Sequence, residues 1–367
     1  MSELQRERER RRWSQEYVAD RIRQLGHEHG HRNLGIDANA VSRHERGIII
    51  IPRHPYPALY AALYSTTVKA LWPDARIDPM ERRGFLRALA ATPVAAMLPA
   101  DADLTTEAVT AVTGGFRRLE ATTAAGELRN PVGAHLRFIA GRLDGGGKRL
   151  AAAASEAAGF AAWLAFDQGA DALARRQYSQ AVAYAERSGS DLLAAYMLGS
   201  MSLWAAEIGN GNHALSLAGR ARGRIARDVP PTVHAWTAAI EATAHASIGN
   251  ADATLAALKR AESAVAQGHE PLWPWLFPFD HAKLAGYVGG CATRLGLPKT
   301  AIPALQEALA GLGPARTKQR ALILADLAAN HRALGNTDQA RALADQARSI
   351  GVEYGSEKIG RRVRQAA

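Results

Sequence analysis

Five glycines recur through the second half of the chain at nearly constant spacing, and this register constrains the fold more than any other feature. They are Gly169, Gly209, Gly249, Gly296 and Gly335, separated by 40, 40, 47 and 39 residues. Self-similarity with a period of roughly 20–50 residues is typical of repeat architectures. The register therefore predicts five copies of one supersecondary unit.

Small side chains occupy three fixed positions around each of these glycines. They are Ala162, Ser202, Ala242, Gly289 and Ala328 seven residues before, Ala174, Ala214, Thr254, Ala301 and Ala340 five residues after, and Ala181, Ala221, Ala261, Ala308 and Ala347 twelve residues after. Two antiparallel helices approach closely only where side chains are small, and the turn between them favours a residue that adopts positive φ. We therefore expect a helical hairpin around each glycine.

The pattern resembles the tetratricopeptide repeat (TPR), most clearly at residues 206–214 and 332–340. The resemblance implies an α-solenoid over residues 105–367. The period exceeds the roughly 34 residues usual in that family, so the loops or helices between repeats must be longer. The alternative is a chance alignment in an alanine-rich chain. Residues 104–160 lack the register and are predicted to form three more helices, broken at Asn130 and Pro131 and at 145–147.

Two short segments near the start of the chain, residues 13–20 and 37–47, each open with a favourable helix N-cap. Ser14 and Asp37 can accept a hydrogen bond from an otherwise unpaired backbone N–H of the first turn. Val18 and Ile22 share one face of the first helix, which predicts a core-facing stripe.

The second segment has a predicted buried side and a predicted exposed side. We expect Ala40, Val41 and His44 to be buried. The exposed side is then a strip of small, amide, hydroxyl and guanidinium groups, of the kind that reads base edges in a major groove. Its residues are Ala38, Asn39, Ser42 and Arg43.

These segments resemble the helix-turn-helix of the phage-repressor-like (XRE) regulators, with a Ser-Gln-Glu start and a Ser-Arg-x-Glu-Arg-Gly finish. The resemblance implies that Gln15 clamps a phosphate and helps to orient the reader helix. It also implies base contacts from Ala38, Asn39, Ser42 and Arg43, and a place near the DNA backbone for Arg46. With the repeats, the chain resembles actinobacterial XRE regulators that carry a C-terminal TPR-like domain.

One departure concerns residues 23–35, which separate the two segments by about ten residues more than the usual tight turn. It leaves the angle between the helices open. An alternative function is a TPR protein-interaction scaffold whose head does not bind DNA, with the apolar residues 48–51 as a partner surface.

Two clusters suggest ligands. His27, Glu28, His29 and His31 could converge on zinc or nickel, which would make the regulator metal-dependent, although we favour a solvated loop and predict no metal site. Four aromatic side chains fill the longest gap between repeats and could anchor an apolar ligand, although a proline-bent hinge explains them more simply. They are Trp273, Trp275, Phe277 and Phe279.

The net charge of +10 favours polyanionic partners. Residues 1–64 hold eleven arginines against eight acids, so charge alone does not locate a DNA-binding end. We expect a solvated first helix, whose arginines could also touch phosphates. The single cysteine, Cys291, excludes an intramolecular disulfide and suits a reducing cytoplasm.

No apolar run reaches the ~18 residues that would span a bilayer. Residues 82–102 look like a twin-arginine export signal but follow some eighty residues of apparent domain, so we interpret them as a linker with a helix that leads into the repeats. The expected domains are a helix-turn-helix head at 1–72, the linker at 73–104 and the repeats at 105–367.

An enzyme is not expected. Residues 145–149 suggest a phosphate loop but lack its leading glycine and the Ser or Thr after Lys148. The chain also has no G-x-S-x-G elbow, H-E-x-x-H pair or cysteine cluster. We therefore predict no catalytic residues and no cofactor.

The sequence thus predicts an all-α, cytoplasmic transcriptional regulator. One reader helix covers only a half-site, so we expect a homodimer on a palindromic double-stranded operator. The family resemblance implies that the repeats sense a peptide or small-molecule effector, in the manner of peptide-pheromone receptors in quorum sensing. No membrane partner is expected.

Overall fold

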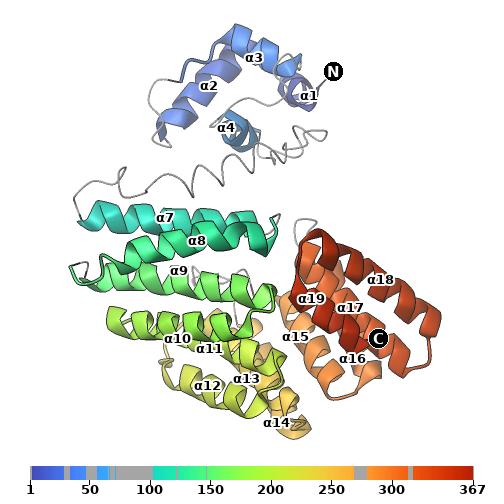
Figure 1. The fold of residues 1–367 in the computed structure, drawn as a ribbon. Coiled ribbons are helices and arrows are strands. Elements are labelled where there is room, and N and C mark those ends of the chain that lie inside the picture. Colours follow the sequence, from blue (N-terminus) through green and yellow to red (C-terminus); the bar gives the residue numbers. More distant parts are fainter. Residues whose placement is uncertain are drawn as a thin grey trace. The chain divides into compact units, whose positions relative to one another are not determined.

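The computed structural model describes residues 2–28, 34–46, 56–64, 66, 71, 102–120, 123–145, 147–267, 279–312 and 317–366. Within these ranges every regular element is a helix, which confirms the all-α prediction (Figure 1). The chain divides into two units, Met1–Phe85 and Leu86–Ala367, and each is described by itself. The division falls within the predicted linker, whose residues 73–101 lie outside the described ranges, as does most of the segment that looks like an export signal.

The first unit has four helices in its described part: α1 (Glu3–Arg10), α2 (Gln15–Glu28), α3 (Ala38–Glu45) and α4 (Tyr56–Leu63). α2 contacts both α3 and α4, and α1 contacts α3. The predicted stripe of Val18 and Ile22 is fully buried in the core between them. Two tyrosines of α4 and the turn after it, Tyr60 and Tyr64, are among the largest buried side chains.

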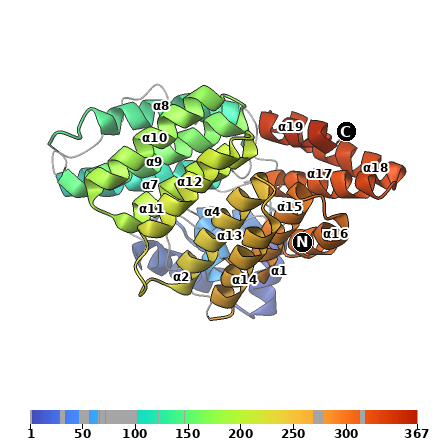
Figure 2. The same cartoon turned by 90° about the horizontal axis from the view of Figure 1, so that it is seen from below.

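The second unit is built mainly from helices that pack in antiparallel pairs. Consecutive pairs are α9 (Gly147–Asp167) with α10 (Asp171–Ser188), α11 (Asp191–Glu207) with α12 (Gly211–Gly223), α13 (Pro231–Ser247) with α14 (Ala251–Val265), α15 (His281–Arg294) with α16 (Pro298–Ala310), and α17 (Thr317–Ala333) with α18 (Thr337–Glu353). α7 (Ala102–Glu120) and α8 (Ala125–Ala140) precede them, and α19 (Glu357–Ala366) follows (Figures 1 and 2).

The glycine register marks the turns inside these pairs, as predicted. Each of the five glycines lies between the two helices of one pair and has a φ between 68° and 82°. All fifteen small residues at the three offsets are buried. The small side chains let the paired helices approach closely, and at Ser155 and Ser202 the hydroxyl also donates to a backbone carbonyl of the partner helix.

The predicted helix break at Asn130 and Pro131 is wrong. α8 runs through Pro131, whose ring is buried; α7 ends at Glu120 and α8 begins at Ala125. A proline inside a helix removes one backbone hydrogen bond, but burial of its ring in the unit's interior offsets that loss. The second predicted break is confirmed, because α9 begins at Gly147.

The first helices of successive pairs also contact one another, from α9 through α11, α13 and α15 to α17. α19 packs on α17 and then contacts α9, so these six helices close a ring of contacts. The hydrogen bond from the Ser356 hydroxyl to Asp167 joins residues 189 positions apart. None of the helices within the described ranges combines the length and apolar character needed to cross a bilayer.

Candidate nucleic-acid interface

α2 begins where the sequence places it. The Ser14 hydroxyl accepts a hydrogen bond from the Tyr17 backbone N–H at 3.0 Å, which satisfies one donor of the first turn. The helix then continues further than predicted, to Glu28, because Leu25 still packs against the core of the unit. A Cβ on Gly26 would lie 2.1 Å from Leu34 Cδ1, so this glycine allows a close approach.

The connection between the two helices is therefore shorter than the predicted insertion of residues 23–35. It runs from residue 29 to Asp37, and residues 29–33 lie outside the described ranges. Part of the additional chain extends α2. The extension follows from the tertiary contacts of Leu25 and Gly26 and not from a local helix signal.

α3 is capped by Asp37, whose carboxylate accepts the Ala40 backbone N–H at 2.7 Å. A cap of this kind contributes about 1 kcal/mol. The predicted buried side is confirmed, because Ala40, Val41 and His44 all lie in the interior.

The opposite side of α3 carries the predicted reader residues. Asn39, Arg43 and Arg46 are exposed, and Ala38 and Ser42 are half-buried. Positions 39, 42, 43 and 46 follow helical spacing and form one stripe along the helix. The stripe presents an amide, a hydroxyl and two guanidinium groups, which suit the edges and phosphates of a nucleic acid. The Arg46 Nε lies 3.4 Å from the Ser42 carbonyl.

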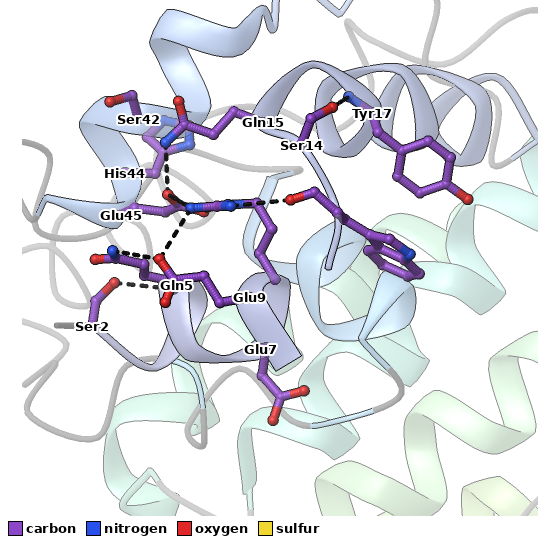
Figure 3. Close-up of polar contacts among 12 residues, drawn as sticks. Ser2, Gln5, Glu7, Glu9, Ser14, Gln15, Tyr17, Ser42, His44 and Glu45 are labelled. Atoms are coloured by element: carbon purple, nitrogen blue, oxygen red, sulfur yellow. Dashed lines mark hydrogen bonds and ion pairs between the residues drawn. The ribbon is translucent and has the colours of Figure 1, made fainter. Parts of the chain in front are cut away.

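Glu45 was expected only as part of a terminal motif, but it organises the unit. Its side chain is 3% exposed and accepts two hydrogen bonds from Arg8, at 2.6 and 3.1 Å. Gln15 Nε2 donates to the same carboxylate at 2.8 Å (Figure 3). The interaction with Glu45 raises the pKa of Arg8 despite partial burial. α1, α2 and α3 therefore meet at one carboxylate.

This network corrects the expectation of a solvated first helix. Arg8 points inward, and its guanidinium also donates to the Trp13 carbonyl at 3.0 Å. Arg10 stays exposed, as predicted. Gln15, expected to clamp a phosphate, is held at the start of α2 by its bond to Glu45, which fixes the amide relative to α3.

A second buried contact ties α3 to α4. His44 Nδ1 lies 3.0 Å from the Tyr60 hydroxyl, inside the core. Burial and the charge of neighbouring Arg43 lower the pKa of His44, so the ring is neutral at pH 7. Burial raises the pKa of Tyr60, which keeps its hydroxyl protonated.

Sequence reasoning missed Arg8, Glu45 and Tyr60 as positioning residues. A signal for Glu45 exists, because it follows Val41 by four residues and so shares the buried side of α3. Nothing in the sequence marks Arg8 among the five arginines of residues 6–12, since its partner is 37 residues away.

The structure describes only part of each of the two predicted ligand clusters. His27 is exposed at the end of α2, whereas His29 and His31 lie outside the described ranges, and the described residues contain no group of three or more metal-binding side chains. Trp273, Trp275 and Phe277 also lie outside these ranges, as do residues 48–51. Phe279 is 4% exposed and packs on Tyr287, with ring centroids 5.6 Å apart.

No protein-family profile and no curated protein sequence matches the chain.

Proposed function

We propose that the protein is a DNA-binding transcriptional regulator. The exposed stripe of Asn39, Ser42, Arg43 and Arg46 on α3 is the observation that carries the proposal. Eight residues of helix are about 12 Å long, a length that fits a major groove about 12 Å wide. In this proposal α2 and α3 form a helix-turn-helix of the XRE type.

The buried network supports the same function. A reader helix discriminates between bases only if its angle to the rest of the head is fixed. Glu45 fixes α3 to α1 and α2, and His44 fixes it to α4, both from the side opposite the stripe. The contacts therefore hold the helix without using the groups that would touch DNA.

The proposal assigns dimerisation and effector sensing to the TPR-like repeats. A dimer would place two reader helices on half-sites about 34 Å apart, which gives a palindromic operator. Sedimentation of the full chain with and without operator DNA would test the stoichiometry of two chains to one duplex.

The direct test is selection of genomic fragments bound by the full chain, followed by mobility-shift competition. Arg43→Ala should lose roughly 1–3 kcal/mol of discrimination between operator and competitor DNA. Arg341→Ala is the matched control, because Arg341 is also exposed but lies on α18 of the second unit. Equal discrimination by both variants would contradict the proposed docking. Failure to retain any DNA would favour the interaction scaffold instead.

A further inference from the structure

The last helix of the chain has two faces that make different contacts. Ile359, Val363 and Ala366 are buried, with at most 4% exposed, and pack against α17 and α18. Their spacing of four and three residues is that of an apolar stripe on a helix. The stripe lies on a floor of mostly small side chains: Ala321, Leu324, Ala325, Ala328, Ala344 and Ala347.

The other side of α19 is basic and contacts residues of α9, α10, α11 and α17. Arg361 pairs with Asp171 at 2.8 Å, and Arg362 pairs with Asp326 at 2.6 Å and with Glu207. The ammonium group of Lys358 lies 4.4 Å from the ring centroid of Trp163 and 4.6 Å from that of Phe166.

Two of the three carboxylates that pair with this basic face are largely withdrawn from water. The exposed fraction of the side chain is 9% for Asp326 and 19% for Glu207, whereas that of Asp171 is 35%. The neighbouring Asp167 is 4% exposed. Other cations reach only part of this acidic set: Arg294 contacts Glu207 at 2.7 Å, and Lys318 contacts Asp167 at 3.2 Å and Glu120 at 2.8 Å.

The burial of these carboxylates limits what could replace α19. An ion pair taken out of water adds little net stability, whereas a buried charge left without its partner is strongly destabilising. A segment that displaced α19 would therefore have to bring cations to Asp326 and Asp171, whereas Glu207 keeps its pair with Arg294. It would also have to bring apolar side chains to the floor of α17 and α18. A basic amphipathic helix meets both requirements.

We propose that the surface formed by α9, α10, α11, α17 and α18 is an interaction site for a basic amphipathic helix of a partner protein, and that α19 fills this site in cis. The ligand pattern is the one α19 displays, with apolar residues at i, i+4 and i+7 and adjacent arginines at i+2 and i+3. Charge complementarity selects this occupant. The inference deepens the sensing role proposed above by naming the class of effector.

The connection to α18 is suited to release of α19. Only Tyr354, Gly355 and Ser356 join the two helices, and Gly355 has a φ of 58°. The Ser356 hydroxyl donates to Asp167 at 2.5 Å and also accepts the Ile359 backbone N–H, so it caps α19 while anchoring it. Release of the helix requires that this anchor, the arginine pairs and the apolar contacts of its buried stripe with α17 and α18 all break.

The test uses the full chain and a fluorescent peptide of residues 354–367. In the wild type, α19 competes in cis at an effective concentration of about a millimolar, so the peptide should bind weakly. In the variant Arg361→Glu/Arg362→Glu, repulsion by the carboxylates should displace α19 from its site. The chain should then bind the peptide at least tenfold more tightly, as measured by fluorescence anisotropy. Arg364→Glu is the matched control, because Arg364 is exposed and pairs, among the described residues, with Glu357 of its own helix, so this variant should behave as wild type.

Unchanged hydrogen exchange in α10 and α12 would show that the repeats of the double variant remain folded. If they do not, Arg361→Gln/Arg362→Gln provides the same comparison with a smaller perturbation. Equal peptide affinity of wild type and the folded double variant would overturn the proposal. So would undiminished affinity for a peptide with both arginines replaced by glutamate, or after Asp171→Asn/Glu207→Gln in the double variant.

A dimer of the wild type formed by exchange of α19, detected by native mass spectrometry and cross-linking, would identify a second copy as the occupant and refute a separate partner. All of these measurements are made without DNA. A chain that binds the peptide but not DNA would therefore contradict the proposed function alone, and the reverse result would contradict this inference alone.

Discussion

The buried pair of Arg8 and Glu45 gives an asymmetric prediction. Arg8→Met leaves the Glu45 carboxylate, 3% exposed, without its cation, and removal of one partner from a buried pair costs roughly 3–5 kcal/mol. Glu45→Leu leaves Arg8, whose side chain is 14% exposed and long enough to turn toward water, so we expect only about 1–2 kcal/mol. The double variant should recover most of the loss.

These losses are large for a unit of this size. A head of about 70 residues has a free energy of unfolding of about 4–10 kcal/mol, so Arg8→Met removes a large fraction of it. Hydrogen exchange of the full chain, read in peptides from α2 and α3, measures the change within the head. A loss of 3 kcal/mol lowers the protection of the slowest amides roughly a hundredfold.

Two internal comparisons make the measurement decisive. Peptides from α10 should keep their protection, and Arg10→Met should stay within about 0.5 kcal/mol, because Arg10 is 69% exposed in its pair with Glu7. If Glu45→Leu lowers protection in α3 more than Arg8→Met does, the argument from the buried carboxylate is wrong.

Two further predictions concern the second unit. Burial lowers the pKa of His135 to about 4 from the ordinary 6.5. The contribution of the neutral ring to the free energy of unfolding is therefore complete above pH 6.5 and is lost as the pH falls, with about 2.5 kcal/mol gone by pH 4.5. His135→Gln should abolish that share of the pH dependence in urea unfolding at the two pH values. A Cβ at Gly199 would lie 2.4 Å from Trp236 Cη2, and overpacking of this kind costs roughly 1–3 kcal/mol. The better helix propensity of alanine offsets about 1 kcal/mol of this cost, so Gly199→Ala should destabilise the unit by up to about 2 kcal/mol. Gly219→Ala in α12, where nothing lies within 4 Å, should instead raise the melting temperature, and equal melting temperatures for both variants would contradict the packing argument.

The sequence predicts the local part of the fold well. The glycine turns and the small buried residues reflect contacts between the two helices of one pair. Both helices of a pair lie within about 40 residues of sequence, so these contacts can be predicted locally. Pro131 shows the limit of local reasoning, because its effect on α8 depends on whether its ring is buried, and burial is decided by other helices.

The sequence also predicts only the local part of the candidate site. The stripe on α3 follows from helical periodicity, and Asp37 and Ser14 from capping chemistry. The partners of Glu45 could not be predicted, since any of several arginines in residues 6–12 could reach it and only the crossing of α1 over α3 selects Arg8. The contacts of α19 with α9 and α11 are equally hidden, because they join residues more than 150 positions apart.

The return of α19 to α9 has a consequence for synthesis. In an open row of repeats each unit depends only on its neighbours, so early repeats can reach their final state before later ones exist. Here Asp167 is made 189 residues before Ser356, which at about 5–20 residues per second is a delay of about 10–40 s. The nascent α9–α14 segment must spend that time with hydrated carboxylates and an unfinished surface. The incomplete state of α9 therefore ends only when α19 has been synthesised and has packed against it.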